Sequence, residues 1–211
     1  MKAFIYLAGS IDPANITEHP KPDDLTIAAD AGYKNAKRLG ERVDILLGDM
    51  DSLGNGDIPS SVEILNFPPE KDLTDAQIAV ETAISRGADD IVIVGGLDGR
   101  LDHTLSVLGI LEDMQARQVH AVALSGYNRI RYIKSTSCLI PKSGYKYLSV
   151  IAVDEKVKGV SVEGCRYPLD NATLTRRVGY AVSNEITGNV ALVSVRRGGI
   201  FIIESKDKTA D

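Results

Sequence analysis

Residues 25–52, LTIAADAGYKNAKRLGERVDILLGDMDS, contain two short apolar runs with a helical segment between them. Residues 25–29 and 44–47 have the length and composition of buried strands, and residues 31–39 have the composition of a helix that stops at Gly40. Short apolar strands that alternate with helices are typical of parallel sheets. This stretch therefore predicts one strand–helix–strand unit of an α/β fold.

The same alternation continues on both sides of it. Further apolar runs of strand length lie at residues 3–8, 62–67, 91–94 and 119–124. Residues 73–86 carry apolar side chains three and four positions apart, and a second helical stripe covers residues 107–114. We therefore expect an N-terminal, Rossmann-like α/β domain with a mainly parallel sheet over residues 1–127.

The second part of the chain has a different pattern. Its short β-type runs, separated by turn residues, lie at residues 130–133, 137–140, 147–153, 157–162, 172–175, 190–195 and 200–204. It shows no long helical period. Such a series of short strands predicts a C-terminal antiparallel β-sandwich over residues 128–211.

Composition excludes several classes of protein. With 44% hydrophobic and 25% charged residues the chain has ordinary globular composition. It lacks an apolar run of the roughly 18 residues that would span a membrane, and we expect a cytoplasmic protein. Cys138 and Cys165 are expected to be free thiols, and a structural zinc site is not expected from two cysteines and 3 histidines.

Charge divides the chain in two. Residues 1–125 hold 21 acidic and 10 basic side chains, whereas residues 126–211 hold 8 acidic and 14 basic ones. The acidic first part argues against nucleic acid as a partner.

Aspartates of the first part follow the predicted strands. Asp30, Asp49, Asp51, Asp98 and Asp102 all lie just beyond a strand, where ligands bind in open α/β sheets. Carboxylates that converge there would repel each other, and Mg²⁺ is the natural compensation. Turn formation alone would also explain an isolated aspartate at such a position.

A second cluster begins the predicted helix at residues 73–86. Thr74 and Gln77 have the spacing of a capping box, which by itself would explain Thr74. Lys71 and Asp75 are not explained by the cap, and a helix N-terminus also attracts phosphate. Both roles can hold together.

A third cluster is Gly99–His103. Arg100 in a glycine-rich loop beside carboxylates indicates a phosphate clamp, although it could be a solvated surface charge. Asp102 could be only the N-cap of the next helix, and a lone histidine such as His103 is more often structural than catalytic. P-loop, G-x-G-x-x-G and G-x-S-x-G motifs are absent, so the pattern favours metal-assisted phosphate chemistry without a P-loop.

Together these motifs resemble the thiamine pyrophosphokinase family in its bacterial form. The matching pieces are Ala-Asp-Ala-Gly at 29–32, Gly-Asp-Met-Asp-Ser at 48–52, Lys-Asp-Leu-Thr-Asp at 71–75, Gly-Gly at 95–96 with Gly-Arg-Leu-Asp-His at 99–103, and Ser-Asn-Glu at 183–185. The resemblance covers nearly the whole chain, and five pieces in register are far more specific than any one of them.

The resemblance implies an enzyme that transfers the pyrophosphoryl group of MgATP to the hydroxyl of thiamine, giving thiamine pyrophosphate and AMP. It also implies a homodimer, with thiamine bound where the α/β domain of one subunit meets the sandwich of the other. A different pyrophosphokinase acting on a pterin alcohol, a D-x-D phosphohydrolase and a non-catalytic nucleotide sensor remain alternatives.

Site residues follow from the resemblance by position. Asp49, Asp51 and Asp75 are the implied Mg²⁺ ligands and, with Asp102, the implied catalytic residues. The nucleotide would contact Asp30, Lys71, Thr74, Arg100 and His103. Thiamine would contact Asp102, Ser183 and Asn184, and either Asp102 or Asp75 would accept the proton of its hydroxyl.

Overall fold

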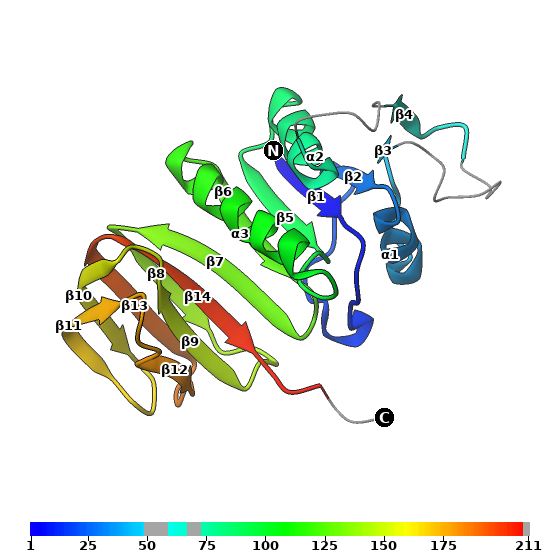
Figure 1. Cartoon of the computed structure of the whole chain (residues 1–211). Coiled ribbons are helices and arrows are strands. Elements are labelled where there is room, and N and C mark those ends of the chain that lie inside the picture. Colours follow the sequence, from blue (N-terminus) through cyan, green and yellow to red (C-terminus); the bar gives the residue numbers. More distant parts are fainter. Residues whose placement is uncertain (49–58, 67–72, 209–211) are drawn as a thin grey trace. The chain divides into compact units, whose positions relative to one another are not determined.

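A computed structural model describes residues 1–48, 59–66 and 73–208 of the chain. The chain divides into two compact units, an N-terminal unit of residues Met1–Gly126 and a C-terminal unit of residues Tyr127–Asp211 (Figure 1). The N-terminal unit combines helices with parallel strands, and the C-terminal unit is built from antiparallel strands.

The N-terminal unit follows the predicted alternation of strands and helices. Its elements are β1 (Lys2–Tyr6), the 3₁₀ turn η1 (Pro13–Asn15), β2 (Leu25–Ala29), α1 (Gly32–Leu39), β3 (Ile45–Gly48), β4 (Glu63–Asn66), α2 (Asp75–Ser85), β5 (Asp90–Val94), α3 (Leu101–Ala116) and β6 (His120–Leu124). The strands lie in the order β6-β5-β1-β2-β3-β4, and every neighbouring pair is parallel. All six carboxyl ends therefore meet at one edge of the sheet.

The central strands are apolar because both of their faces are covered. Phe4, Ile27, Leu46 and Val92 are at most 1% exposed. Helix α1 begins in direct contact with β1: a Cβ atom on Gly32 would lie 2.0 Å from the carbonyl oxygen of Tyr6. Only glycine allows the helix to start so close to the strand.

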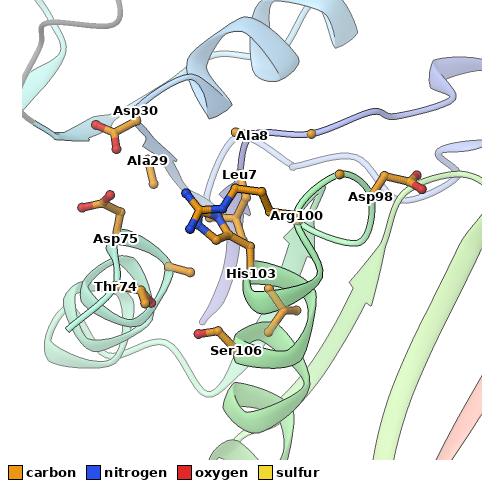
Figure 2. A pocket seen from close by; sticks show the side chains of 15 residues that line it. Leu7, Ala8, Ala29, Asp30, Thr74, Asp75, Asp98, Arg100, His103 and Ser106 are labelled. Carbon is orange, nitrogen blue, oxygen red and sulfur yellow. The ribbon is translucent and has the colours of Figure 1, made fainter.

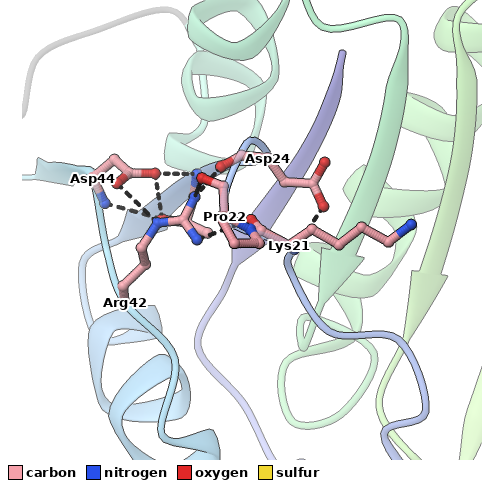
Figure 3. Close-up of polar contacts among 6 residues, drawn as sticks. Lys21, Pro22, Asp24, Arg42 and Asp44 are labelled. Carbon is pink, nitrogen blue, oxygen red and sulfur yellow. Dashed lines mark hydrogen bonds and ion pairs between the residues drawn. The ribbon is translucent and has the colours of Figure 1, made fainter.

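Arg42 fastens the long connection between β1 and β2 (Figure 3). Its guanidinium donates to the carbonyl oxygens of Lys21 and Pro22, at 3.0 Å each, and to that of Asp24. Its Nε also donates to Asp44 Oδ1 at 3.2 Å. The Arg42 side chain thus binds three carbonyl oxygens of this connection and the carboxylate of Asp44.

The C-terminal unit contains eight strands among its described residues. These are β7 (Asn128–Lys134), β8 (Ser137–Pro141), β9 (Tyr147–Ala152), β10 (Lys156–Glu163), β11 (Leu169–Thr175), β12 (Ala181–Asn184), β13 (Val190–Arg197) and β14 (Gly199–Ser205). Strands β12-β9-β14-β7 form one antiparallel arrangement and β11-β10-β13-β8 another. One hydrophobic cluster includes Leu148 and Ile200 from the first and Val157 and Val193 from the second.

Cys138 and Cys165 are free, as predicted. No helix in the described part of the chain is both long and apolar enough to cross a membrane.

Candidate active site

A pocket of about 450 Å³ lies in the N-terminal unit, at the carboxyl ends of its strands. It is lined by five of the predicted site residues, Asp30 after β2, Thr74 and Asp75 at the start of α2, and Arg100 and His103 at the start of α3. Figure 2 shows Asp30 and Asp75 on one side of this pocket and the side chains of Arg100 and His103 directed toward it. Residues separated by more than 70 positions in the sequence therefore share one cavity of a size typical for small ligands.

Asp30 is held in an unusual backbone conformation beside β3. Its φ is 45°, its N–H donates to the carbonyl oxygen of Leu47 at 2.7 Å, and its own carbonyl oxygen accepts from the N–H of Tyr33 at 3.1 Å. A Cβ atom on Gly48 would lie only 1.7 Å from Asp30 Oδ1. The carboxylate therefore packs on the bare backbone of Gly48, the residue that immediately precedes Asp49 in the sequence.

Helix α2 begins with the capping box that the sequence predicts. The Thr74 hydroxyl accepts from the N–H of Gln77 at 3.3 Å, and Gln77 Oε1 accepts from the N–H of Thr74 at 2.9 Å. Asp75 is the first residue of the helix. The capped N-terminus thus places a hydroxyl, a carboxylate and the positive end of the helix dipole at the pocket.

Arg100 and Asp102 form a bidentate pair at the start of α3. Arg100 Nη2 donates to Asp102 Oδ2 at 2.6 Å and Nε donates to Oδ1 at 3.2 Å. The hydrogen bond from Arg100 is the main reason that the pKa of Asp102 lies below its usual range, and the same bond raises the pKa of Arg100. Both side chains are well exposed, at 72% and 61%.

The possibility that Asp102 is only an N-cap is wrong. Helix α3 begins at Leu101 with Arg100 in the N-cap position, so Asp102 already lies in the first turn. Its Oδ1 accepts from the neighbouring N–H of His103 at 3.0 Å. Asp102 does not line the pocket itself, and its contact with the site runs through Arg100.

Other predicted residues lie elsewhere. Asp49, Asp51 and Lys71 fall outside the described residues. Ser183 and Asn184 lie on β12 of the C-terminal unit, where the Ser183 N–H donates to Ser149 Oγ at 3.0 Å and Asn184 is buried.

Some pocket residues were not predicted from the sequence. The loop after β1 contributes Leu7, Ala8 and Gly9, and α3 contributes Ser106. A signal was present for Ser106, because it lies three positions after His103 and therefore on the same face of α3. Asp98, which the sequence places among the aspartates that follow the strands, also lines the pocket, but its side chain points away from Asp30 and Asp75 (Figure 2).

Oxygen donors dominate the polar lining of this pocket. Asp30 and Asp75 supply carboxylates, which suit a hard cation such as Mg²⁺. Within the described ranges no group of three or more His, Cys, Asp and Glu side chains could hold a metal ion. Two of the three implied ligands, Asp49 and Asp51, lie outside those ranges.

Comparisons with known proteins agree with this two-part organisation. Residues 18–123 match the family model described as the catalytic domain of thiamin pyrophosphokinase, and residues 137–200 match that of its vitamin B1 binding domain. The thiamine pyrophosphokinase of Bacillus subtilis (strain 168) is 27% identical over 216 residues, covering 98% of this chain and 100% of that protein. Thiamin pyrophosphokinase 1 of Caenorhabditis elegans is 27% identical over 169 residues, covering 76% of this chain and 69% of that protein.

Solved structures show the same fold. The crystal structure of Bacillus subtilis thiamine pyrophosphokinase matches with a TM-score of 0.86 at 23% identity, covering 99% of this chain and 100% of that one. The crystal structure of a thiamin pyrophosphokinase family protein from Enterococcus faecalis matches with a TM-score of 0.81 at 26% identity, covering 99% and 100% of the two chains.

An α/β unit with this pocket, followed by a β unit that matches a vitamin-binding domain, defines a transferase of the pyrophosphokinase class. The chain belongs to the thiamin pyrophosphokinase family. It uses ATP and thiamine as substrates and transfers the pyrophosphoryl group of ATP to the thiamine hydroxyl, giving thiamine pyrophosphate and AMP.

Proposed function

We propose that the pocket of the N-terminal unit binds the polyphosphate of ATP and that the transfer takes place there. The observation that carries this proposal is the convergence of Asp30, Thr74, Asp75, Arg100 and His103 on one cavity at the carboxyl edge of a parallel sheet. Pyrophosphoryl transfer depends on positioning and charge neutralisation more than on covalent chemistry. The pocket offers both.

Positive groups would hold the phosphates. The N-terminus of α2, with the Thr74 hydroxyl, presents N–H groups and the positive end of the helix dipole. Arg100 lines the pocket from the start of α3, and the Nη1–Nη2 edge of its guanidinium, opposite the edge that binds Asp102, would bind a phosphate oxygen. Lys71 and His103 would complete the nucleotide contacts, as the sequence predicts.

Carboxylates would hold Mg²⁺. We assign Asp49, Asp51 and Asp75 as its ligands, and a bound Mg²⁺ would neutralise the charge that develops on the phosphates. The close contact between Asp30 and Gly48 supports this assignment, because it brings a further carboxylate to the residue next to Asp49. Asp30 would therefore strengthen the negative field around the ion.

Asp102 is better suited to binding than to proton transfer. Its lowered pKa keeps the carboxylate ionised at neutral pH and makes it a weaker base than an ordinary aspartate. A fixed negative charge at this position would attract the cationic thiazolium ring of thiamine. Asp75 remains the other candidate for the residue that accepts the hydroxyl proton.

The C-terminal unit would bind thiamine through Ser183 and Asn184, in a cytoplasmic homodimer whose active sites lie between subunits. Exposed apolar side chains support an interface on both units: Leu101 and Leu105 lie one turn apart on α3 and are 70% and 58% exposed, and Tyr180 and Val182 beside Ser183 are 67% and 48% exposed.

An activity assay with a matched pair of variants tests the catalytic assignment. Wild-type protein with MgATP and thiamine should release AMP and thiamine pyrophosphate together. Asp49→Asn should abolish both while the circular dichroism spectrum and Tm stay unchanged. Asp113→Asn, the same replacement at an exposed position of α3, serves as the control and should keep full activity. Near-normal AMP release by Asp49→Asn would refute the metal assignment.

Mixed dimers test the shared active site. Asp49→Asn and Ser183→Arg should each be inactive, the second because its bulk and charge repel thiamine. If the two residues meet across an interface, one site of each mixed dimer is intact, and coexpression should restore about a quarter of wild-type activity. If both residues served the same subunit, the mixture would stay inactive.

A further inference from the structure

Asn35 of α1 holds the segment of chain that follows β1. Its Nδ2 donates to the carbonyl oxygen of Leu7 at 2.7 Å and to that of Gly9 at 3.0 Å. Carbonyl oxygens can only accept, so the NH₂ group of the carboxamide must face them and both of its hydrogens are used. The residue is only 8% exposed. A buried amide thus binds main-chain groups that lie 28 and 26 positions earlier in the sequence.

The segment that Asn35 holds is part of the wall of the pocket. Leu7, Ala8 and Gly9 line it, and Figure 2 labels Leu7 and Ala8 among the pocket residues. Ala8 and Gly9 are exposed, so a ligand in the pocket would meet their main chain directly. Asn35 is buried behind them and is not part of the pocket lining. It can therefore act on a ligand only through this segment.

Helix α1 lies on the opposite face of the sheet from α3. The crossover β2–α1–β3 runs toward one edge of the sheet, and the crossover β5–α3–β6 runs toward the other. Because such crossovers are right-handed, the two helices cover opposite faces. Tyr33 and Ala36 of α1 accordingly share a hydrophobic cluster with Phe4 of β1, to which the described residues of α3 contribute none. Asn35 therefore holds its segment from the side away from α3.

The two bonds of Asn35 set the direction of the peptide group between Leu7 and Ala8. In a trans peptide group the C=O and the N–H point in opposite directions. Since the Leu7 carbonyl points to Asn35, the Ala8 N–H points away from it. The Ala8 carbonyl is also bound, because it accepts from the N–H of Gly96 at 2.9 Å. In the described part of the chain, by contrast, the N–H groups of Ala8 and Gly9 make no hydrogen bond.

This arrangement suits an anion. Main-chain N–H groups that have no partner within the protein bind phosphate oxygens well, whereas carbonyl oxygens repel them. If the peptide group between Leu7 and Ala8 rotated, its oxygen would take the place of its N–H at the pocket. Asn35 opposes this rotation, because it binds a carbonyl oxygen on each side of Ala8.

We propose that Asn35 is a positioning residue for the polyphosphate of ATP, acting through the N–H groups of Ala8 and Gly9. It keeps these donors directed to the phosphates and ordered before ATP binds, which reduces the entropy lost on binding. The proposal rests on the proposed assignment of the polyphosphate to this pocket. It adds to that assignment a residue of α1 that does not touch the ligand.

Steady-state kinetics of Asn35 variants test the proposal. Asn35→Ala should raise the KM for ATP about tenfold, which is the effect expected from losing well-placed hydrogen bonds. Its KM for thiamine should stay near the wild-type value. Asn35→Asp keeps the size of the side chain but turns an oxygen toward the two carbonyl oxygens, so it should raise the KM for ATP at least as much. An equal rise in both KM values would overturn the proposal, since it would indicate general damage to the protein.

Thr26 provides the matched control for a purely structural role. It is fully buried in β2 of the same unit and does not line the pocket. Its hydroxyl also makes two hydrogen bonds, donating to Asp44 Oδ2 at 2.7 Å and accepting from the N–H of Asp44 at 3.0 Å. Thr26→Val should therefore lower Tm and leave the KM for ATP unchanged. The same result for Asn35→Ala would overturn the proposal.

Arg100→Ala distinguishes failure of this proposal from failure of the pocket assignment. It should raise the KM for ATP, because Arg100 lines the pocket itself. If it does so and Asn35→Ala does not, the pocket binds the phosphates and only the role of Asn35 is wrong. If neither variant changes the KM for ATP, both proposals are wrong. Should Asn35→Ala fail to fold, Asn35→Ser, which keeps a single donor, takes its place with the same outcomes.

Discussion

Replacing Gly48 by alanine should damage the active site through Asp30. The new Cβ atom would lie 1.7 Å from Asp30 Oδ1. A carbon and an oxygen atom in contact lie about 3.3 Å apart, so the carboxylate must retreat by about 1.6 Å from its present position. A displacement of this size at a catalytic site can lower kcat/KM by about 100-fold.

The same replacement should also lower stability. The φ of Gly48 is 144°, in a region that alanine rarely adopts. Such strain costs about 1–3 kcal/mol, which corresponds to a Tm lower by about 3–9 °C for a chain of this length. Thermal unfolding and steady-state release of AMP measure the two effects separately.

Gly40→Ala is the control that separates strain from collision. Gly40 also has a positive φ, of 74°, but a Cβ atom there would meet nothing within 4 Å. It should therefore lose stability and keep its activity. The double variant Asp30→Gly with Gly48→Ala should recover stability relative to Gly48→Ala, since the colliding carboxylate is gone. Full activity in Gly48→Ala, or equal loss of activity in Gly40→Ala, would refute the reasoning.

Three further predictions concern other parts of the chain. Thr74→Ala removes the hydroxyl that accepts from the N–H of Gln77 in the capping box, and it should lower the free energy of unfolding by about 1 kcal/mol, measured by urea denaturation. Arg100→Gln should raise the pKa of Asp102 back into the ordinary range of an aspartate in an NMR titration, because the hydrogen bond from Arg100 is the main cause of the lowered pKa. Since the pKa in the folded protein is lower than in the unfolded chain, the stabilisation from this pair is present at neutral pH and is lost as the pH falls through the folded pKa. Burial raises the pKa of the Cys138 and Cys165 thiols, so both should react with a disulfide reagent about tenfold more slowly in the folded protein than after unfolding.

The N-terminal unit could be predicted well because its central strands are buried on both faces. Continuous apolar runs identify such strands, and β2 has the bounds that the sequence predicts, Leu25–Ala29. The start of α3 was harder to place. Its apolar stripe indicates a helix near residues 107–114, whereas the helix begins at Leu101 with exposed and polar residues that face the pocket or solvent.

Strand β12 was missed for a physical reason. Val182 and Ser183 are exposed, and the strand bends at a register shift. Neither the apolar run of a buried strand nor a regular alternation is therefore present in its sequence. The sandwich description of the C-terminal unit stays a prediction.

The candidate site, like the fold, could be predicted only in part from the sequence. Asp30, Thr74, Asp75, Arg100 and His103 could be found because parallel strands bring their carboxyl ends to one edge. The hydrogen bond from the Tyr167 N–H to Asn184 Oδ1 could not be predicted, because a bond between residues 17 positions apart leaves no periodic pattern in the sequence.

The way in which Arg42 holds the loop before β2 has a consequence for how this loop can evolve. Arg42 binds the main-chain carbonyl oxygens of Lys21, Pro22 and Asp24, and every amino acid carries such an oxygen. Substitutions at positions 21 and 22 therefore leave the hydrogen bonds of Arg42 unchanged as long as the backbone keeps its path. Natural variation should accumulate in this loop while position 42 stays arginine. A lysine ammonium has three donor hydrogens and could not bind three carbonyl oxygens and Asp44 at once.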